Sequence, residues 1–436
     1  MTTISGLTEA DVLALSQAYA EPDWLRDRRQ EAFKAFSDLP WPDNRVEEWR
    51  YTNPARFDLE RKVRNDGDSG LPARRDGIVA ALGDDVAGRV RIVDGAVVEA
   101  ASAVDGVIVS DLASAAREHP ELVREALGSV VPPDTKFDAL NLAAFTGSAF
   151  IAIPADTEVD RPLAVSIDVA APGAVLPRVL VVAGAHAKAT VYVDHGGNAD
   201  ATVVEVVEVV VGEGARVDVA TSQDWGPDVD HIGAHTGLVG DNGDYRHLEA
   251  TLGGNTVYIR PDVRLDFRGG NAELLGVYFC DSGMHVEHRS LIHHNASQTT
   301  SDLVYKGALQ GDSSATFFGN IRIEPHARAT SSDQTNRNLI LTDGAKADSI
   351  PFLEIENSDV VRCGHHSSVG QVDEAQLFYL ESRGIPREEA ARMLVFAFLN
   401  EVMDRVELPG VTETVMGEIE EEVQHGPTAL MDQRRR

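Results

Sequence analysis

Residues 203–211 read VVEVVEVVV, the strongest β-strand signal in this chain of 436 residues. β-branched residues are enriched in strands because their side chains pack well on a pleated surface. Two shorter runs of the same kind precede this stretch, LAVSIDV at 163–169 and VLVV at 179–182. The pattern predicts that β structure takes over from about residue 149.

Glycine-rich turns separate the strand runs at regular distances. The turns begin at Gly184, Gly212, Gly240 and Gly269, which lie 28, 28 and 29 residues apart. A fixed period of this length is typical of a solenoid, in which each coil pairs with the coils above and below it. A β-sandwich with evenly spaced hairpins is the alternative, but hairpin turns favour Asn-Gly or Asp-Gly between paired strands. We therefore expect a parallel β-helix.

Helical patterns flank this core on both sides. Thr8 and Asp11 form a T-x-x-D capping pattern, and Gly384 followed by Pro386 indicates the end of one helix and the start of the next. The predicted helices cover residues 8–19, 22–36, 111–127, 134–145, 372–383, 386–403 and 411–423. We expect a mainly β protein with a mixed helical region at 1–148, a parallel β-helix at 149–370 and a helical region at 371–436.

The composition excludes several classes of protein. With 39 Lys and Arg against 70 Asp and Glu, the formal charge is −31, which disfavours nucleic acid and anionic lipid as partners. No stretch approaches the length of apolar chain that spans a membrane, and the first residues do not form a signal peptide. Two distant cysteines, Cys280 and Cys363, exclude a disulfide framework and favour a cytoplasmic location.

The chemistry-bearing residues are histidines and one cysteine. The chain contains no P-loop, no G-x-S-x-G and no H-E-x-x-H motif. Seven of its 14 histidines fall between His285 and His366, and any single one is expected to be a polar residue on a solvent-facing coil. Cys363 and His365 differ because residues two apart on a strand face the same side, and both can bind iron or zinc. A buried, inert Cys363 beside a solvated His365 is the alternative.

A long ordered block between residues 300 and 400 resembles a known family. It contains QTNRNLIL at 334–341, PFLEI at 351–355 and DVVRCGH at 359–365. The match extends upstream through SDLVYKG at 301–307 and FGNI at 318–321, and downstream through 373–386. These motifs closely resemble the C-terminal signature of the SufB/SufD family, the scaffold proteins of the SUF iron–sulfur cluster assembly machinery. WRYT at 49–52 is similar to an N-terminal motif of the SufD branch.

The resemblance implies a right-handed parallel β-helix between two helical regions. It implies a non-catalytic scaffold that pairs with a SufB paralogue and with the SufC ATPase, which would supply ATP hydrolysis. A nascent iron–sulfur cluster would form at the interface with SufB, held transiently and not bound tightly by this chain alone. The position that matches the histidine ligand is His365, with His366 and Cys363 as further candidates. The ATPase-binding residues would lie on the first C-terminal helix and the loop after it: Phe378, Tyr379, Arg383, Ile385 and Arg387.

The chain departs from the family pattern at three places. Asn336 stands where SufB has a cysteine one coil before the histidine, which favours SufD over SufB. The segment 360–362 holds one residue more than the usual SufD spacing, and His366 replaces the usual glycine. A SufB-type scaffold or a SufD-like homodimer is the alternative, and a β-helix enzyme that cleaves polysaccharides is a distant one.

Overall fold

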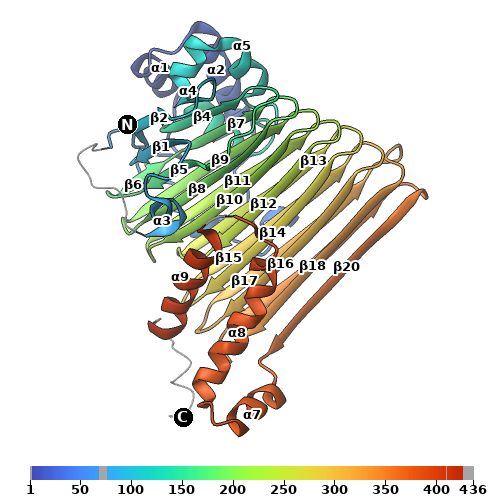
Figure 1. Ribbon diagram of the computed structural model, residues 1–436. Helices are drawn as coiled ribbons and strands as arrows, with labels where there is room; N and C mark the ends of the chain where they lie inside the picture. Colours follow the sequence, from blue (N-terminus) through green and yellow to red (C-terminus); the bar gives the residue numbers. More distant parts are fainter. Residues whose placement is uncertain (1, 68–75, 409, 426–436) are drawn as a thin grey trace.

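The computed structural model describes residues 2–67, 76–408 and 410–425. Its core is a parallel β-solenoid built from two sheets, with helices at both ends (Figure 1). The first sheet runs in the order β2 (Ala96–Ser102), β1 (Gly88–Val93), β5 (Leu163–Asp168), β8 (Lys188–Gly197), β10 (Arg216–Trp225), β12 (Asp244–Thr251), β14 (Asn271–Cys280), β16 (Thr300–Leu309), β18 (Thr330–Ile340), β20 (Val360–Gln371). The second runs in the order β19 (Lys346–Ile355), β17 (Ser314–Ile323), β15 (His285–His294), β13 (Thr256–Leu265), β11 (Val229–Val239), β9 (Ala201–Val211), β7 (Arg178–Ala183), β4 (Ser148–Ile153), β3 (Ile108–Asp111), with β6 (Gly173–Val175) beside β9.

The strand register confirms the solenoid and excludes the β-sandwich. Apart from β2 and β3, which pair antiparallel at the start of the sheets, the strands pair in parallel with those of neighbouring coils, as when Lys188 pairs with Arg216 and Arg216 with Asp244. The coil is therefore 28 residues long in this part of the chain. Near the end it lengthens to 31 residues, where Ser331 pairs with Arg362. Sequential hairpins of a sandwich would instead pair neighbouring strands antiparallel.

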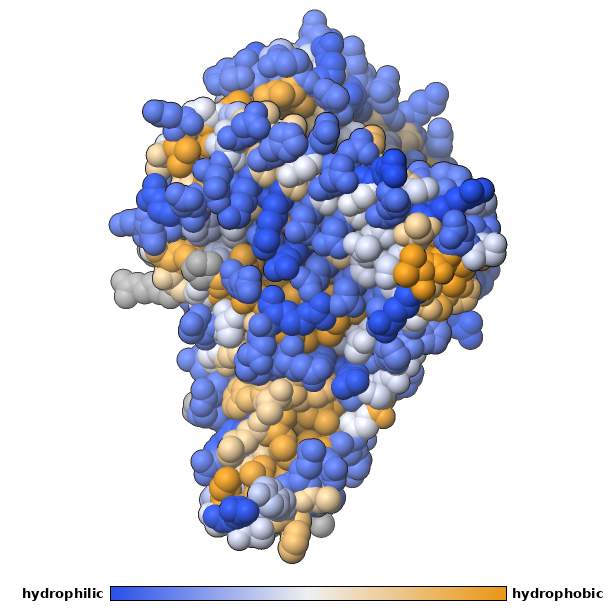
Figure 2. Space-filling view, turned by 45° about the vertical axis from the view of Figure 1, so that its right-hand side comes forward, coloured by the Kyte–Doolittle hydropathy of each residue, from blue (hydrophilic) through white to orange (hydrophobic). Residues whose placement is uncertain are grey.

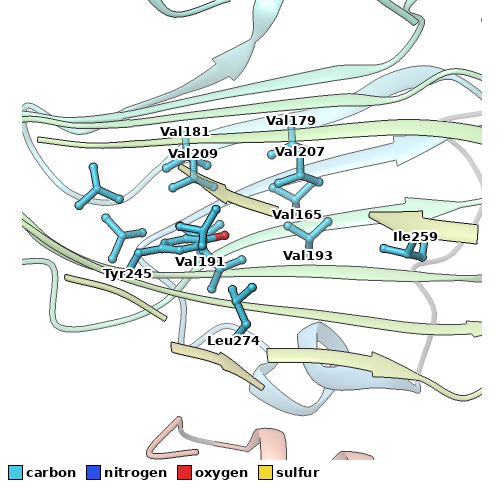
Figure 3. Close-up of a cluster of buried hydrophobic side chains, with 14 of the residues drawn as sticks. Val165, Val179, Val181, Val191, Val193, Val207, Val209, Tyr245, Ile259 and Leu274 are labelled. Atoms are coloured by element: carbon cyan, nitrogen blue, oxygen red, sulfur yellow. The ribbon is translucent and has the colours of Figure 1, made fainter. Parts of the chain in front are cut away.

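The strand at 203–211 is buried on both faces, which explains why its valines do not alternate with polar residues. Val203, Val207 and Val209 point into the solenoid interior, where they belong to one continuous core of buried aliphatic side chains (Figure 3). Val204 and Val206 point to the outer face and are buried as well, Val204 beneath the N-terminal helical region. A strand buried on both faces reads as a nearly continuous apolar run.

The N-terminal region covers the outer face of the second sheet at the start of the solenoid. It contains α1 (Glu9–Ala18), α2 (Asp23–Asp38), η1 (Glu47–Trp49), η2 (Pro54–Arg56), α4 (Leu112–Glu118), α5 (Pro120–Ala126) and α6 (Lys136–Ala144). The capping box predicted from Thr8 and Asp11 is present at α1. The helix predicted at 111–127 is divided at His119, because Pro120 has no N–H to continue the first helix.

Helices α8 (Arg387–Met403), α9 (Val411–His425) and α3 (Gly77–Leu82) lie on the first sheet. Helix α7 (Glu374–Ser382) packs mainly on α8. Val395, Leu399 and Val402 of α8 are buried in a core shared with the outer face of β14 and β16. The boundaries at 148 and 370 stay predictions, and β1 from the N-terminal region extends the first sheet through its parallel pairing with β5.

Candidate functional site

The last coil of the solenoid is open. Among the described residues, β20 pairs only with β18 and forms the edge of the first sheet, while β19 forms the edge of the second. Most side chains of β20 are exposed, and Val361 and Val369 are 72% and 45% exposed. A long edge strand with unpaired N–H and C=O groups is a template on which another strand can pair.

Cys363 and His365 lie on the inner face of β20. In the parallel register Cys363 pairs with Ser332 and His365 with Gln334, and both partners are buried side chains of the solenoid interior. Side chains that pair in parallel strands point to the same face. The thiol and the imidazole therefore lie side by side on the surface that closes the interior at this end.

His366 points to the outer face. Its Nε2 lies 3.8 Å from Asp333 Oδ1, and Arg362 Nη2 donates to Asp333 Oδ2 over 2.7 Å. The two adjacent histidines thus occupy opposite faces of one strand, and only His365 shares a face with Cys363.

The extra residue in the segment 360–362 is absorbed by a β-bulge. Thr330 pairs with Val360, but the next residue, Ser331, pairs with Arg362, so Val361 has no partner opposite it. A bulge of this kind shifts the register by one residue and leaves the strand beyond it regularly paired. Cys363 and His365 consequently stay on the inner face although the segment is longer.

A polar layer lies directly beneath β20. Asn336, opposite Ser367, donates to Tyr278 Oη over 3.2 Å and to the carbonyl of Tyr305 over 3.3 Å, and Asn338 donates to Asn336 over 2.8 Å. Asn336 is buried, so its side chain is part of a hydrogen-bonded interior.

The two cysteines have different surroundings. Burial, with the nearby Asp333 carboxylate, raises the pKa of the half-buried Cys363, so the thiol is protonated at neutral pH. Cys280 is fully buried among aliphatic side chains, and burial raises its pKa far above the usual value. Cys363 is therefore the cysteine that a partner or a metal can reach, and binding a metal would require loss of its proton.

The candidate ATPase-binding residues lie on a projecting part of the molecule. Helix α7 contacts mainly α8, and Phe378 and Tyr379 are exposed. Arg383 Nη2 donates to Tyr379 Oη over 3.0 Å, and the guanidinium lies 5.1 Å from the ring centroid. Figure 2 shows apolar surface gathered on the narrow lower end, where Figure 1 places α7 and α8.

Ion pairs fix the turn between α7 and α8. Arg387, at the start of α8, bonds to Glu374 and lies 3.4 Å from Glu381 Oε2, so it ties both ends of α7 to α8. Ile385 in the connecting turn is half-buried. Gly384 adopts a φ of +87°, which favours glycine and ends α7. The five residues therefore all lie on α7, in the connecting turn or at the start of α8.

Three of the seven histidines between His285 and His366 do not follow the expectation of solvent-facing residues, whereas His326, His365 and His366 are exposed. His285, His288 and His294 are buried in or against the solenoid interior, because their strand positions fall on its inner face or beneath the N-terminal segment. His293 is partly exposed and faces Glu324, with 2.8 Å between His293 Nε2 and Glu324 Oε1.

A second group was missed by the sequence analysis. Glu205, in the middle of the valine-rich run, meets His195, His231 and His235 inside the solenoid. The two glutamates in an otherwise apolar strand were the available signal, since a buried carboxylate needs a partner. His195 lies 10 residues earlier on β8, and His231 and His235 lie on the next coil, so the three partners could be identified only with the register.

The N-terminal WRYT segment is attached to the outer face of the second sheet. The ring of Trp49 stacks on Tyr258 with 4.4 Å between centroids, and Thr52 Oγ1 lies 2.7 Å from His285 Nε2. Both contacts join residues more than 200 positions apart, so this short segment fixes the N-terminal region to the solenoid.

Taken as a class, the molecule is a parallel β-solenoid with an open last coil that presents a thiol and an imidazole, followed by projecting helices. The family model of the SUF system FeS cluster assembly SufBD core domain matches residues 166–398. An iron–sulfur cluster assembly SufBD family protein of Mycobacterium leprae is 37% identical over 68% of this chain and 77% of the relative. SufD of Bacillus subtilis is 28% identical over 94% of this chain and 96% of the relative.

The chain therefore belongs to the SufBD family of iron–sulfur cluster assembly proteins. A Staphylococcus haemolyticus member of the same family is 29% identical over 90% of the chain. Within the described ranges, no helix combines the length and the apolar character that crossing a membrane requires.

Proposed function

We propose that this chain is a SufD-type subunit that pairs with a SufB-type paralogue through its last coil and helps to assemble a nascent iron–sulfur cluster at that interface. The observation that carries the proposal is the open edge of β20, on which Cys363 and His365 share the inner face. Strand pairing by a partner would place that partner's side chains against the same face.

The ligand inventory supports a shared site. Cluster iron is held mainly by thiolates, and this chain offers one accessible cysteine, Cys363, because Cys280 is buried. His365 can add an imidazole nitrogen. The remaining thiolates would come from the partner, so the cluster is cargo at an interface and this chain acts as a scaffold without catalysis of its own.

The C-terminal helices supply the second contact. We propose that a SufC-type ABC ATPase binds the α7–α8 corner through Phe378, Tyr379, Arg383, Ile385 and Arg387. Aromatic residues and arginine are enriched at protein interfaces, and this corner presents two exposed aromatic side chains beside two arginines. The chain carries no P-loop of its own, so ATP hydrolysis would come from the partner. Movement of this corner on ATP binding would reach the solenoid through α8, which packs on β14 and β16.

The test is assembly in the cytoplasm of an expression host with the candidate partners. Co-expression with a SufB-type and a SufC-type protein should yield a complex of defined mass that contains iron and sulfide. His365→Ala should reduce the iron and sulfide content several-fold and leave the complex intact. His366→Ala, one residue away but on the outer face, is the matched control and should keep the cluster.

Equal cluster content in the two variants would contradict the site assignment. Failure to bind either partner, with a stable dimer of this chain alone, would favour the homodimer that pairs through the same edge. The family membership argues against the polysaccharide-cleaving alternative.

A further inference from the structure

A carboxylate in the middle of the solenoid interior is surrounded by imidazoles. Glu205 lies on β9, and its neighbour in the register on β11 is Gly233, with His231 and His235 two residues to either side on the same face. His231 Nε2 and His235 Nε2 each lie 3.2 Å from Glu205 Oε2. His195, on β8 of the opposite sheet, places its Nε2 2.8 Å from the same oxygen. All four side chains are buried.

The Nδ1 of each histidine has a hydrogen-bond acceptor within reach, and Trp225 Nε1 also donates to His231 Nδ1 over 3.2 Å. His195 Nδ1 lies 2.9 Å from the carbonyl oxygen of Ser222, His231 Nδ1 lies 2.7 Å from Gln223 Oε1, and His235 Nδ1 lies 2.7 Å from Glu249 Oε2. At His195 and His235, an Nδ1–H that donates to the carbonyl or carboxylate leaves the Nε2 lone pair free, which is how metal-binding histidines are oriented in proteins.

Glu205 differs from two other buried glutamates, which have arginine partners, and resembles Glu249, whose ion-pair partners are His235 and His247. Glu208 is paired with Arg178, with 2.6 Å between Oε2 and Nη2, and Glu21 is paired with Arg29 over 2.7 Å. Among the described residues, the charged or titratable partners of Glu205 are histidines alone. A buried carboxylate is stable only beside a compensating cation, and here that cation must be a proton on an imidazole or a metal ion.

Gly233 carries no side chain at the point where the donors converge. A Cβ on this residue would lie 3.1 Å from His235 Nε2 and 3.4 Å from His231 Nε2. The position faces the interior of a well-packed core, where a larger side chain would be usual. A Cβ would also lie 2.7 Å from Ile259 Cδ1, so the position requires glycine, and no side chain of residue 233 separates the two imidazoles from Glu205.

We propose that Glu205, His231 and His235 form a binding site for one divalent first-row transition metal ion inside the solenoid. The three donor atoms lie within 4.8 Å of one another, as ligands of one ion must. Two imidazoles and one carboxylate are a donor set that suits iron(II), cobalt(II) and zinc(II). His195 is a candidate fourth ligand, and Glu249 is the carboxylate that orients His235.

This site is separate from the open last coil. In the second sheet, β11 is four strands from the terminal β19, which corresponds to about 19 Å at the usual strand spacing. The assignment rests on the donors and not on the proposed function, and it would hold for a chain that never met a SufB-type partner. Iron(II) is the member of the class that cluster assembly would use.

The experiment measures metal retained by the full-length chain. Stripped protein is incubated anaerobically with iron(II) or cobalt(II), desalted and analysed for metal by mass spectrometry. We expect about one ion per chain, with a visible cobalt(II) ligand-field spectrum. Glu205→Gln and His231→Gln should each lower the retained metal at least tenfold. His294→Gln, which changes a buried histidine that faces only Thr299 and Ser301 hydroxyls, should retain it.

Three results would overturn the proposal. The first is absence of retained metal in the wild-type chain, which would make the cluster a buried proton-linked network. The second is full retention in Glu205→Gln and His231→Gln. The third is loss of metal in His247→Gln but not in His231→Gln, which would move the site to the neighbouring group of His235, His247 and Glu249. If a variant does not fold, anomalous scattering from cobalt-soaked wild-type crystals decides where the ion lies.

Discussion

At the scale of single residues, the solenoid interior holds titratable groups that a folded chain keeps neutral. His294 shows the principle most simply. It is buried, its two nitrogens lie 2.8 Å from Thr299 Oγ1 and 2.9 Å from Ser301 Oγ, and burial lowers its pKa to about 3. The hydroxyls satisfy a neutral ring and offer no negative charge to an imidazolium.

This arrangement predicts a loss of stability in acid. The unfolded chain binds a proton at His294 below about pH 6.5, whereas the folded chain does so only near pH 3, so stability falls as the pH drops through this window. Lowering the pH from 7 to 5 should decrease the free energy of unfolding by about 2 kcal/mol through His294. Urea unfolding of wild type and His294→Gln at both pH values measures the difference. Parallel losses in the two proteins would contradict the prediction.

At the scale of elements, helix α8 is attached to the solenoid by one buried cation. Lys306 on β16 is fully buried, and its Nζ donates to the carbonyl of Phe398 over 2.9 Å and to the Glu401 carboxylate. The ammonium also lies 4.6 Å from the centroid of the Phe398 ring. The contact joins a strand and a helix about 90 residues apart. Because hydrogen bonds are directional and apolar packing is not, it fixes the position of α8 on the sheet.

Replacing this lysine should loosen the helices without unfolding the solenoid. Lys306→Met keeps the apolar stem but removes the donor, which should cost about 1–3 kcal/mol because the Phe398 carbonyl loses its partner. Limited proteolysis should then cleave within residues 374–425 faster than in the wild type. Lys346→Met, which changes an exposed lysine paired with Asp348, is the control. Unchanged cleavage in Lys306→Met would show that apolar packing alone holds α8.

At the scale of the whole molecule, burial falls along the solenoid toward its open end. The side chains of β9 and β11 are almost all buried, whereas those of β20 are mostly exposed. Each coil of a solenoid is stabilised chiefly by its two neighbours, and the last coil has only one. The edge that a partner would use is thus also the least stabilised part of the β structure.

Amide hydrogen exchange should reveal this gradient. We expect amides of β19 and β20 to exchange at least tenfold faster than those of β9 and β11, because local opening requires less free energy where fewer contacts are lost. Addition of a SufB-type partner should slow exchange in β20 and leave β9 unchanged. Uniform protection along the free chain would contradict the gradient.

Much of the architecture could be predicted from the sequence. The regular spacing of Gly184, Gly212 and Gly240 predicts coils of constant length, and the capping residues Thr8 and Asp11 predict a helix start. Both predictions depend on residues close together in the chain and not on the tertiary packing around them. The break at Pro120 was missed although its signal is local, since a proline has no N–H to continue the preceding helix.

The sequence by itself determined the solenoid, its approximate period, the family and the shared face of Cys363 and His365, because these depend on residues close together in the chain. Only the tertiary structure decided that this face is the inner one, since the bulge at Val361 sets the register. Only the tertiary structure placed Glu205 among His195, His231 and His235. The stacking of coils makes neighbours of residues about 28 positions apart, and no local pattern records which of them will meet.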